Sequence, residues 1–188
     1  PPPNAPPHRA GVADVTTAKH TEDAGLFVDT AARFYGVSSL LASPFDPSDG
    51  LVLQYEATLQ DGLECGGAYL KFLAADDAFS PATLDGDSGY SVMFGPDKCG
   101  ATNKVHVIFR HVSPLDGSVE EKHLKNPPAM LSDELPHLYT LVVKKDNTFE
   151  VKIDGESAAE GSLFENFEPP FNPPAEIDDP EDSKPADW

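Results

Sequence analysis

Residues 138–155 read LYTLVVKKDNTFEVKIDG, and this stretch decides the fold. Leu138–Val143 is rich in apolar and β-branched residues, residues 144–147 are polar, and Thr148–Asp154 alternates polar and apolar side chains. Two such segments around a polar tip are typical of a β-hairpin. Alternation with a period of two buries one face of a strand and leaves the other face in water. The stretch therefore predicts two antiparallel strands.

Further strand patterns lie on the N-terminal side of this hairpin. Short apolar runs occupy residues 26–28, 34–37 and 51–59, and residues 104–110 alternate with a single slip. No stretch of comparable length has an apolar stripe at helical spacing, although a single helical turn is open at residues 162–167. An all-β protein, built as an antiparallel sandwich, is the expected fold class.

The composition argues against several kinds of partner. The 188 residues are enough for one compact domain and a tail. Lys and Arg number 13 against 32 Asp and Glu, so the formal net charge of -19 opposes binding to nucleic acid or to an anionic membrane surface. No run approaches the ~20 apolar residues of a membrane-spanning helix. We expect no nucleic-acid partner and no membrane contact from this segment; the acidic surface suits cations, basic protein tails or solubility alone.

Proline-rich segments flank the strand region. Residues 1–22 contain five prolines and few large apolar side chains, which predicts a loose leader. Residues 177–188 read IDDPEDSKPADW, an acidic and extended composition that cannot enter a central strand. A disordered linker and the start of a proline-containing repeat both remain open for this tail.

The two cysteines, Cys65 and Cys99, permit two interpretations. A disulfide between them would close a loop of roughly 35 residues and stabilise the fold by about 3 to 4 kcal/mol. Two buried thiols are the alternative, and composition alone leaves both open.

Three blocks of sequence resemble the calnexin/calreticulin family, and calnexin more closely than calreticulin. They are LECGGAYLK at 63–71, YSVMFGPDKCG at 90–100 followed by HVIFRH at 106–111, and the tail at 177–188. The resemblance covers residues 23–188 and leaves the leader unmatched. It implies a concanavalin-like jelly-roll β-sandwich, the fold of legume lectins, in residues 23–172 and the start of a proline-rich arm in residues 173–188. It also implies an oxidising compartment and hence a Cys65–Cys99 disulfide.

The function implied by this resemblance is that of a lectin chaperone of the endoplasmic reticulum, in its lumen or on the luminal side of its membrane. Such a protein binds monoglucosylated high-mannose N-glycans on folding glycoproteins. Carried over by position, the sugar-contacting residues are Tyr69, Lys71, Tyr90, Met93 and Glu121. An aromatic ring, an amine and a carboxylate suit a polyol, whose hydroxyls both donate and accept hydrogen bonds. Without the resemblance, Tyr69 and Tyr90 are more often half-buried core aromatics, and Lys71 is usually a solvated charge on a strand face.

The resemblance further implies a bound metal and protein partners. One structural calcium ion (Ca2+) is expected, with Asp23 at a ligand position. The family's proline-rich arm recruits a disulfide isomerase-class oxidoreductase near its distal tip, so we expect that contact only from a full-length arm. Family segments before and after the matched region are absent, which predicts a sandwich that lacks strands and has open edges. A glycan-independent chaperone or interaction module, which binds unfolded polypeptide at such an edge, is the alternative function.

The residues that resemble enzyme or zinc-site motifs do not complete those motifs. Residues 86–89, Gly-Asp-Ser-Gly, resemble a protease nucleophile loop but lack the glycine that should follow. Glu120 and Glu121 are adjacent on an expected strand and face opposite sides, unlike a glycosidase pair. His106 and His111 also face opposite sides, which does not suit a zinc site. We expect a binding protein and no enzyme.

Overall fold

The computed structural model describes residues 14–17, 24–28, 30–75, 80–172 and 184. Strands account for most of the regular structure in this part of the chain. Their bounds are β1 Asp14–Thr17, β2 Ala24–Phe27, β3 Gly50–Thr58, β4 Cys65–Gly67, β5 Leu70–Leu73, β6 Tyr90–Cys99, β7 Thr102–Val112, β8 Val119–Leu124, β9 Pro136–Lys144, β10 Thr148–Ile153, β11 Glu156–Ser162 and β12 Phe167–Glu168. Three short helical turns accompany them: η1 Pro47–Asp49, η2 Pro81–Thr83 and α1 Leu163–Asn166.

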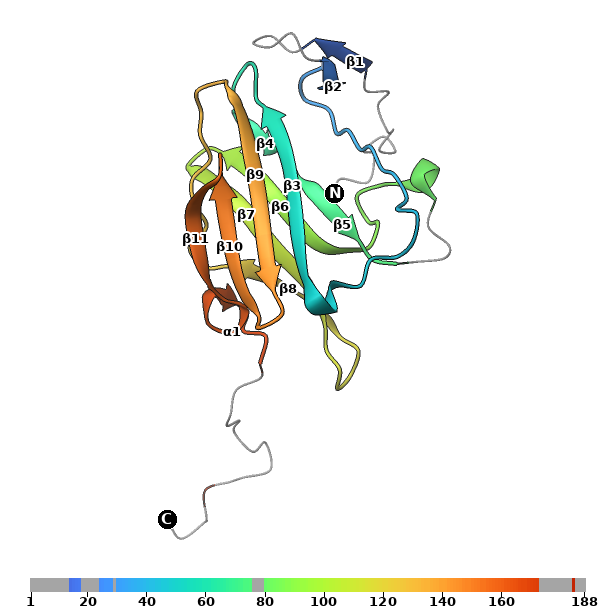
Figure 1. Ribbon diagram of the computed structural model, residues 1–188, viewed down its shortest axis with the longest axis vertical. Coiled ribbons are helices and arrows are strands. Elements are labelled where there is room, and N and C mark those ends of the chain that lie inside the picture. The colour runs from blue at the N-terminus through green and yellow to red at the C-terminus, as the bar shows by residue number, and fades with distance from the viewer. Residues whose placement is uncertain (1–13, 18–23, 29, 76–79, 173–183, 185–188) are drawn as a thin grey trace.

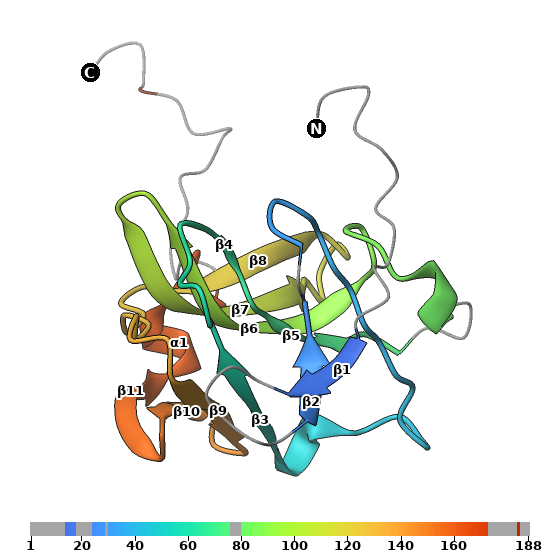
Figure 2. The same ribbon diagram turned by 90° about the horizontal axis from the view of Figure 1, so that it is seen from above.

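Two sheets stack face to face (Figures 1 and 2). The four-stranded sheet has the order β11-β10-β9-β3. The six-stranded sheet has the order β12-β8-β7-β6-β4, and β5 pairs with β6 beside β4. All pairings between these strands are antiparallel, which confirms the predicted antiparallel sandwich. No helix within the described ranges is long and apolar enough to cross a membrane.

The hairpin predicted at residues 138–155 is formed by β9 and β10. Phe149 pairs with Val143, and Val151 pairs with Leu141. At the tip, Asn147 has a positive φ of 63°, which asparagine tolerates well. The side chain of Asp146 accepts a hydrogen bond from the Thr148 amide at 3.0 Å and so fixes the turn. The polar tip and the alternating strand thus have the roles that the sequence predicts.

The core lies between the inner faces of the two sheets. Its fully buried side chains follow the alternation of the strands and come from both layers: Phe94, Val105, Val107, Tyr139, Leu141, Val151 and Phe167. Phe167 on β12 closes one end of the core, with its ring 5.3 Å from the rings of both Phe109 and Phe149. The turn α1 precedes it, capped by the Ser162 side chain. The helical turn left open at residues 162–167 therefore forms.

Two segments differ from expectation. The strand predicted at Phe34–Val37 is wrong, because these residues lie outside every ladder and Phe34 is 80% exposed. An apolar run becomes a strand only where another strand pairs with it, and the described residues supply none here. In contrast, β1 lies inside the leader expected at 1–22 and pairs with β2. The β-branched residues at 15–17 favour this ribbon, a signal that the proline count obscured.

Candidate functional site

The outer face of the six-stranded sheet carries a transverse row of side chains. Lys71 on β5 pairs with Met93 on β6, Met93 pairs with Ile108 on β7, and Ile108 pairs with His123 on β8. Residues that lie directly opposite one another on neighbouring strands project from the same face. The row therefore crosses four strands and brings together residues that are up to about 50 positions apart in sequence.

A first hydrogen-bonded chain joins Tyr90, Glu121 and His123 at this row. The Tyr90 hydroxyl donates to Glu121 Oε1, and His123 Nε2 lies 3.2 Å from Glu121 Oε2. Lys71 Nζ lies over the Tyr90 ring, 5.1 Å from its centre, in cation–π geometry. Burial raises the pKa of the Tyr90 hydroxyl, and the hydrogen bond to Glu121 raises it further. Tyr90 therefore remains a neutral donor at physiological pH.

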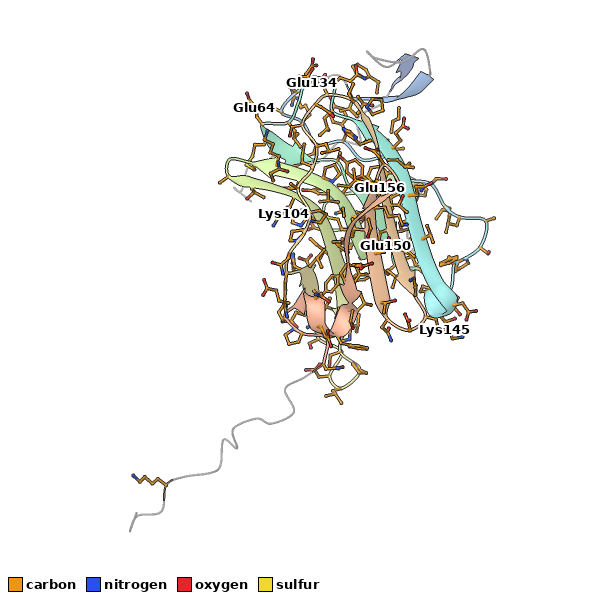
Figure 3. All side chains as sticks on the ribbon, turned by 60° about the vertical axis from the view of Figure 1, so that its left-hand side comes forward. Glu64, Lys104, Glu134, Lys145, Glu150 and Glu156 are labelled. Carbon is orange, nitrogen blue, oxygen red and sulfur yellow. A yellow bond between two sulfur atoms is a disulfide. The ribbon has the colours of Figure 1, made fainter. Side chains whose placement is uncertain are left out.

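A second chain joins Tyr69, Asp97 and His106 on the same face. The Tyr69 hydroxyl donates to Asp97 Oδ2, and His106 Nε2 lies 3.8 Å from the same oxygen. Burial lowers the pKa of the His106 imidazole, and the charge of Lys104, labelled in Figure 3, lowers it further. His106 is therefore neutral at physiological pH, and Asp97 has a neutral imidazole beside it.

The two chains are close to each other. The rings of Tyr69 and His106 are 6.0 Å apart, centre to centre, and those of His106 and His123 are 6.4 Å apart. The second chain continues the first along the face of β7. Aromatic rings, two carboxylates, imidazoles and an ammonium group are thus gathered on one surface.

A disulfide fixes the loop that carries Tyr69. Cys65 and Cys99 lie opposite each other on β4 and β6 and are bonded. A Cβ on Gly67 would lie 2.1 Å from the Tyr69 ring, so the absence of a side chain at 67 makes room for that ring. The disulfide implied by the resemblance is therefore present. Gly67 leaves the space that the ring of Tyr69, in the same loop, occupies.

Tyr55 supports the same loop from the opposite sheet. It belongs to β3, and its hydroxyl crosses the sandwich to donate to the Ala68 carbonyl at 2.6 Å. Gly95 on β6 permits this contact: a Cβ there would lie 2.0 Å from the Tyr55 hydroxyl and 2.4 Å from the Ala68 oxygen. The peptide group between Ala68 and Tyr69 is thus held by a side chain of the opposite sheet.

These groups can bind a neutral, hydroxyl-rich ligand. Tyr69 is 36% exposed, and the side chains of Glu121 and His123 are 48% and 41% exposed. Carboxylates accept from hydroxyls, an ammonium donates to them, and ring faces pack on the C–H surface of a sugar. Glu120 faces the other side of β8 and pairs with Lys122, so the adjacent Glu120 and Glu121 do not form a pair of facing carboxylates of the kind that a glycosidase uses.

The five residues predicted to contact sugar are brought together on this one face. Tyr69 and Lys71 lie on the same side of the chain, as their spacing of two predicts, and Met93 is partly buried between Lys71 and Ile108. Sequence reasoning missed three neighbours: Asp97, His106 and His123. A spacing of two was the available signal, because it places His123 beside Glu121 on a strand.

The metal prediction is a separate matter. Asp23 lies outside the described residues. Among the residues that are described, no three acidic, histidine or cysteine side chains are arranged to hold a metal ion. The calcium site therefore stays a prediction, and no role of the outer face depends on it.

The two stacked antiparallel sheets define the class of all-β sandwich proteins. The family model described as "Calreticulin family" matches residues 9–188. The chain therefore belongs to the calreticulin family, whose members are lectin chaperones. Because the match begins at residue 9, the expectation that the leader is unmatched is wrong.

Calnexin-type proteins are similar to most of this chain. It is 51% identical to "Calnexin homolog 2" of Arabidopsis thaliana over 173 residues, which cover 89% of this chain and 32% of that protein. Identity to "Calnexin homolog" of Glycine max is 49% over 171 residues, 89% of this chain and 31% of that protein. "Calmegin" of Bos taurus is 48% identical over 171 residues, 88% of this chain and 28% of that protein. The chain thus spans about a third of the length of these relatives.

A solved structure, "T. cruzi calreticulin globular domain", shares the fold. The TM-score is 0.74 at 33% sequence identity, and the match covers 84% of this chain and 58% of that chain. This confirms the jelly-roll sandwich predicted from the sequence. The higher identity to calnexin homologues agrees with the closer resemblance to calnexin.

Proposed function

We propose that this chain is the glycan-binding part of a lectin chaperone of the endoplasmic reticulum and binds monoglucosylated high-mannose N-glycans on folding glycoproteins. Membership of the calreticulin family supports the class of function. The glycan itself is inferred from the five positions that match the family's sugar contacts. The chain acts by binding and releasing its ligand and carries out no covalent chemistry.

One observation carries the proposal: all five of these positions lie on a single outer face of the six-stranded sheet. The Tyr90–Glu121 hydrogen bond and the Lys71–Tyr90 contact join three of them directly, although they come from three different strands. The disulfide and Tyr55 hold Tyr69 beside them. Preorganised polar groups lower the entropy cost of binding a flexible oligosaccharide.

A glycan array with the whole chain tests the proposal. We expect retention of monoglucosylated oligomannose and at least tenfold weaker retention of the same glycan without glucose. Tyr69→Ala and Lys71→Ala should each abolish this retention, because each removes a group that faces the ligand. Gln54→Ala is the matched control, since Gln54 faces outward from the other sheet and bonds to Thr140 at 2.8 Å. Equal binding of all oligomannose glycans, or none, would contradict the proposal.

Binding of unfolded polypeptide is the second candidate function. Exposed apolar side chains at residues 34–41 favour it: Phe34, Val37, Leu40 and Leu41 are each more than 60% exposed. Contiguous exposed apolar surface often marks a protein contact. Deglycosylated, reduced client protein distinguishes the two functions. Its capture by the Tyr69→Ala variant would support the polypeptide function, and capture that depends on the glycan would support the lectin.

Calcium binding and an oxidoreductase partner remain part of the proposal as expectations. Titration calorimetry with calcium should detect one site, which Asp23→Asn weakens; heat equal to buffer dilution would exclude it. We expect that residues 173–188 by themselves do not bind a disulfide isomerase-class oxidoreductase. A pull-down that retained this partner would overturn that statement.

A further inference from the structure

We infer that His123 is a positioning residue for glycan binding, which holds the carboxylate of Glu121 in the orientation that receives sugar hydroxyls. The inference rests on the proposed function and deepens it. It assigns a role to a histidine that the sequence did not single out. It also predicts that another side chain with an N–H donor at this position preserves glycan affinity.

The first step is the way Glu121 is held. Tyr90 donates to Oε1, and His123 Nε2 lies 3.2 Å from Oε2, so each carboxylate oxygen has one protein partner. A carboxylate can accept about four hydrogen bonds, which leaves about two for ligand hydroxyls. A glutamate that is half exposed would otherwise sample several rotamers and lose that freedom on binding. The two contacts remove this cost in advance.

The second step is the way His123 itself is held. Its strand β8 lies between β7 and β12, and His123 pairs with Ile108 on one side and Glu168 on the other. The ring of His106 lies 6.4 Å away in an edge-to-face arrangement. The backbone of His123 is therefore fixed from both sides, and its imidazole has a ring neighbour on the ligand face. Glu121 gains a partner that is itself well placed.

The third step is the kind of contact that His123 supplies. His123 and Glu121 are two residues apart on β8 and therefore share one face of the strand. The ring nitrogen Nε2 lies 3.2 Å from Glu121 Oε2, so an N–H group at this place orients the carboxylate by donating to it. A different side chain of similar reach that carries an N–H donor should hold Glu121 in the same way.

Two substitutions at His123 separate the hydrogen-bond donor from the rest of the side chain. His123→Ala removes the contact with Glu121, and we expect at least fivefold weaker binding of monoglucosylated oligomannose. His123→Gln keeps an N–H donor of similar reach. It should bind within about twofold of the wild type, because donation to the Glu121 carboxylate is retained.

The matched control is His111→Gln in the same sheet. His111 faces the opposite side of β7, with its ring 5.5 Å from that of Phe171. This variant should keep the affinity of the wild type. Calorimetry of the whole chain measures all four proteins, and thermal unfolding checks that each is folded.

The outcomes distinguish this inference from the function on which it rests. A wild-type chain that binds no glycan overturns the proposed function. A wild-type chain that binds, with His123→Ala equally tight or His123→Gln as weak as His123→Ala, overturns the role of His123 alone. Weak binding by His123→Ala together with near wild-type binding by His123→Gln supports it.

Discussion

Two histidine–carboxylate arrangements in this molecule use the same groups in opposite ways. His137, at the end of the four-stranded sheet, is buried and has both ring nitrogens 2.7 Å from carboxylates, Nδ1 from Asp154 and Nε2 from Asp133. His123, on the outer face of the six-stranded sheet, contacts only Glu121 through Nε2, and both side chains are well exposed. The first arrangement is closed and the second is open.

The difference lies in the capacity left for a ligand. In the closed arrangement every donor of the imidazole is used, and Asp154 also accepts from the Leu138 amide at 2.8 Å. Such a cluster stabilises the end of a sheet, because breaking it leaves buried polar groups unpaired. In the open arrangement, Glu121 keeps free acceptor positions that face solvent. In our proposal, this incomplete pairing is what allows Glu121 to accept hydrogen bonds from a ligand.

The largest effect on the free energy of unfolding is expected at Gly95, where Tyr55 supports the loop beside the open arrangement. Gly95 has a φ of 144°, and a Cβ there would collide with the Tyr55 hydroxyl and the Ala68 carbonyl. Gly95→Ala should therefore lower the free energy of unfolding by about 4 kcal/mol, through backbone strain and a lost buried hydrogen bond. Chemical denaturation measures this change.

Gly155→Ala is the control for Gly95→Ala. Gly155 also has a positive φ, 85°, but nothing lies within 4 Å of a Cβ built there. It should lose only about 1 kcal/mol, from backbone conformation alone. Equal losses for the two variants would show that Tyr55 and Ala68 do not determine the need for glycine at position 95.

A smaller effect is expected in the closed arrangement, and it depends on pH. Burial lowers the pKa of His137, but the hydrogen bonds with Asp133 and Asp154 outweigh burial and raise it above the ordinary value. Its stabilisation is thus complete below about pH 6.5 and is lost as the pH rises through the raised pKa. The hydrogen bond with His137 lowers the pKa of Asp133. Hydrogen bonds with the Leu138 amide and with His137 lower the pKa of Asp154. Their contributions are present above about pH 4 and are lost on acidification.

His137→Gln keeps a neutral donor and removes the charge. The variant should be less stable than the wild type by about 2 kcal/mol at pH 5.5, with a smaller difference at pH 9. Urea unfolding at the two pH values gives the difference directly. A difference that grows towards pH 9 would mean that His137 is held as a neutral ring.

The sequence predicted local features of both arrangements. Which strands pair with each other, and hence which side chains meet, is known only from the structure. Alternation at 148–154 correctly placed Phe149 and Val151 in the core, and spacing placed Tyr69 and Lys71 on one face. Periodicity carries no information on which strands become neighbours, so the contact of Tyr90 with Glu121, 31 residues away, could not be read from it. The same limit explains the segment at 34–37, which has strand-like residues but no partner strand. The family resemblance grouped five positions that the structure places on one face, because it carries pairing information that composition lacks.

The smallest effect is expected at two adjacent glycines beside the open arrangement. A Cβ on Gly67 would overlap the Tyr69 ring at 2.1 Å, whereas a Cβ on Gly66 would meet only the flexible end of Leu63 at 3.3 Å. Gly67→Ala should push the phenol away from Asp97 and weaken glycan binding about tenfold, or about 1.4 kcal/mol, in a chain that still folds. Gly66→Ala should change affinity less than twofold, as calorimetry with the same oligosaccharide would measure. If both variants bound the glycan equally weakly, the position of the Tyr69 ring would not be what limits affinity. Both glycines would then serve the close approach of sugar to backbone.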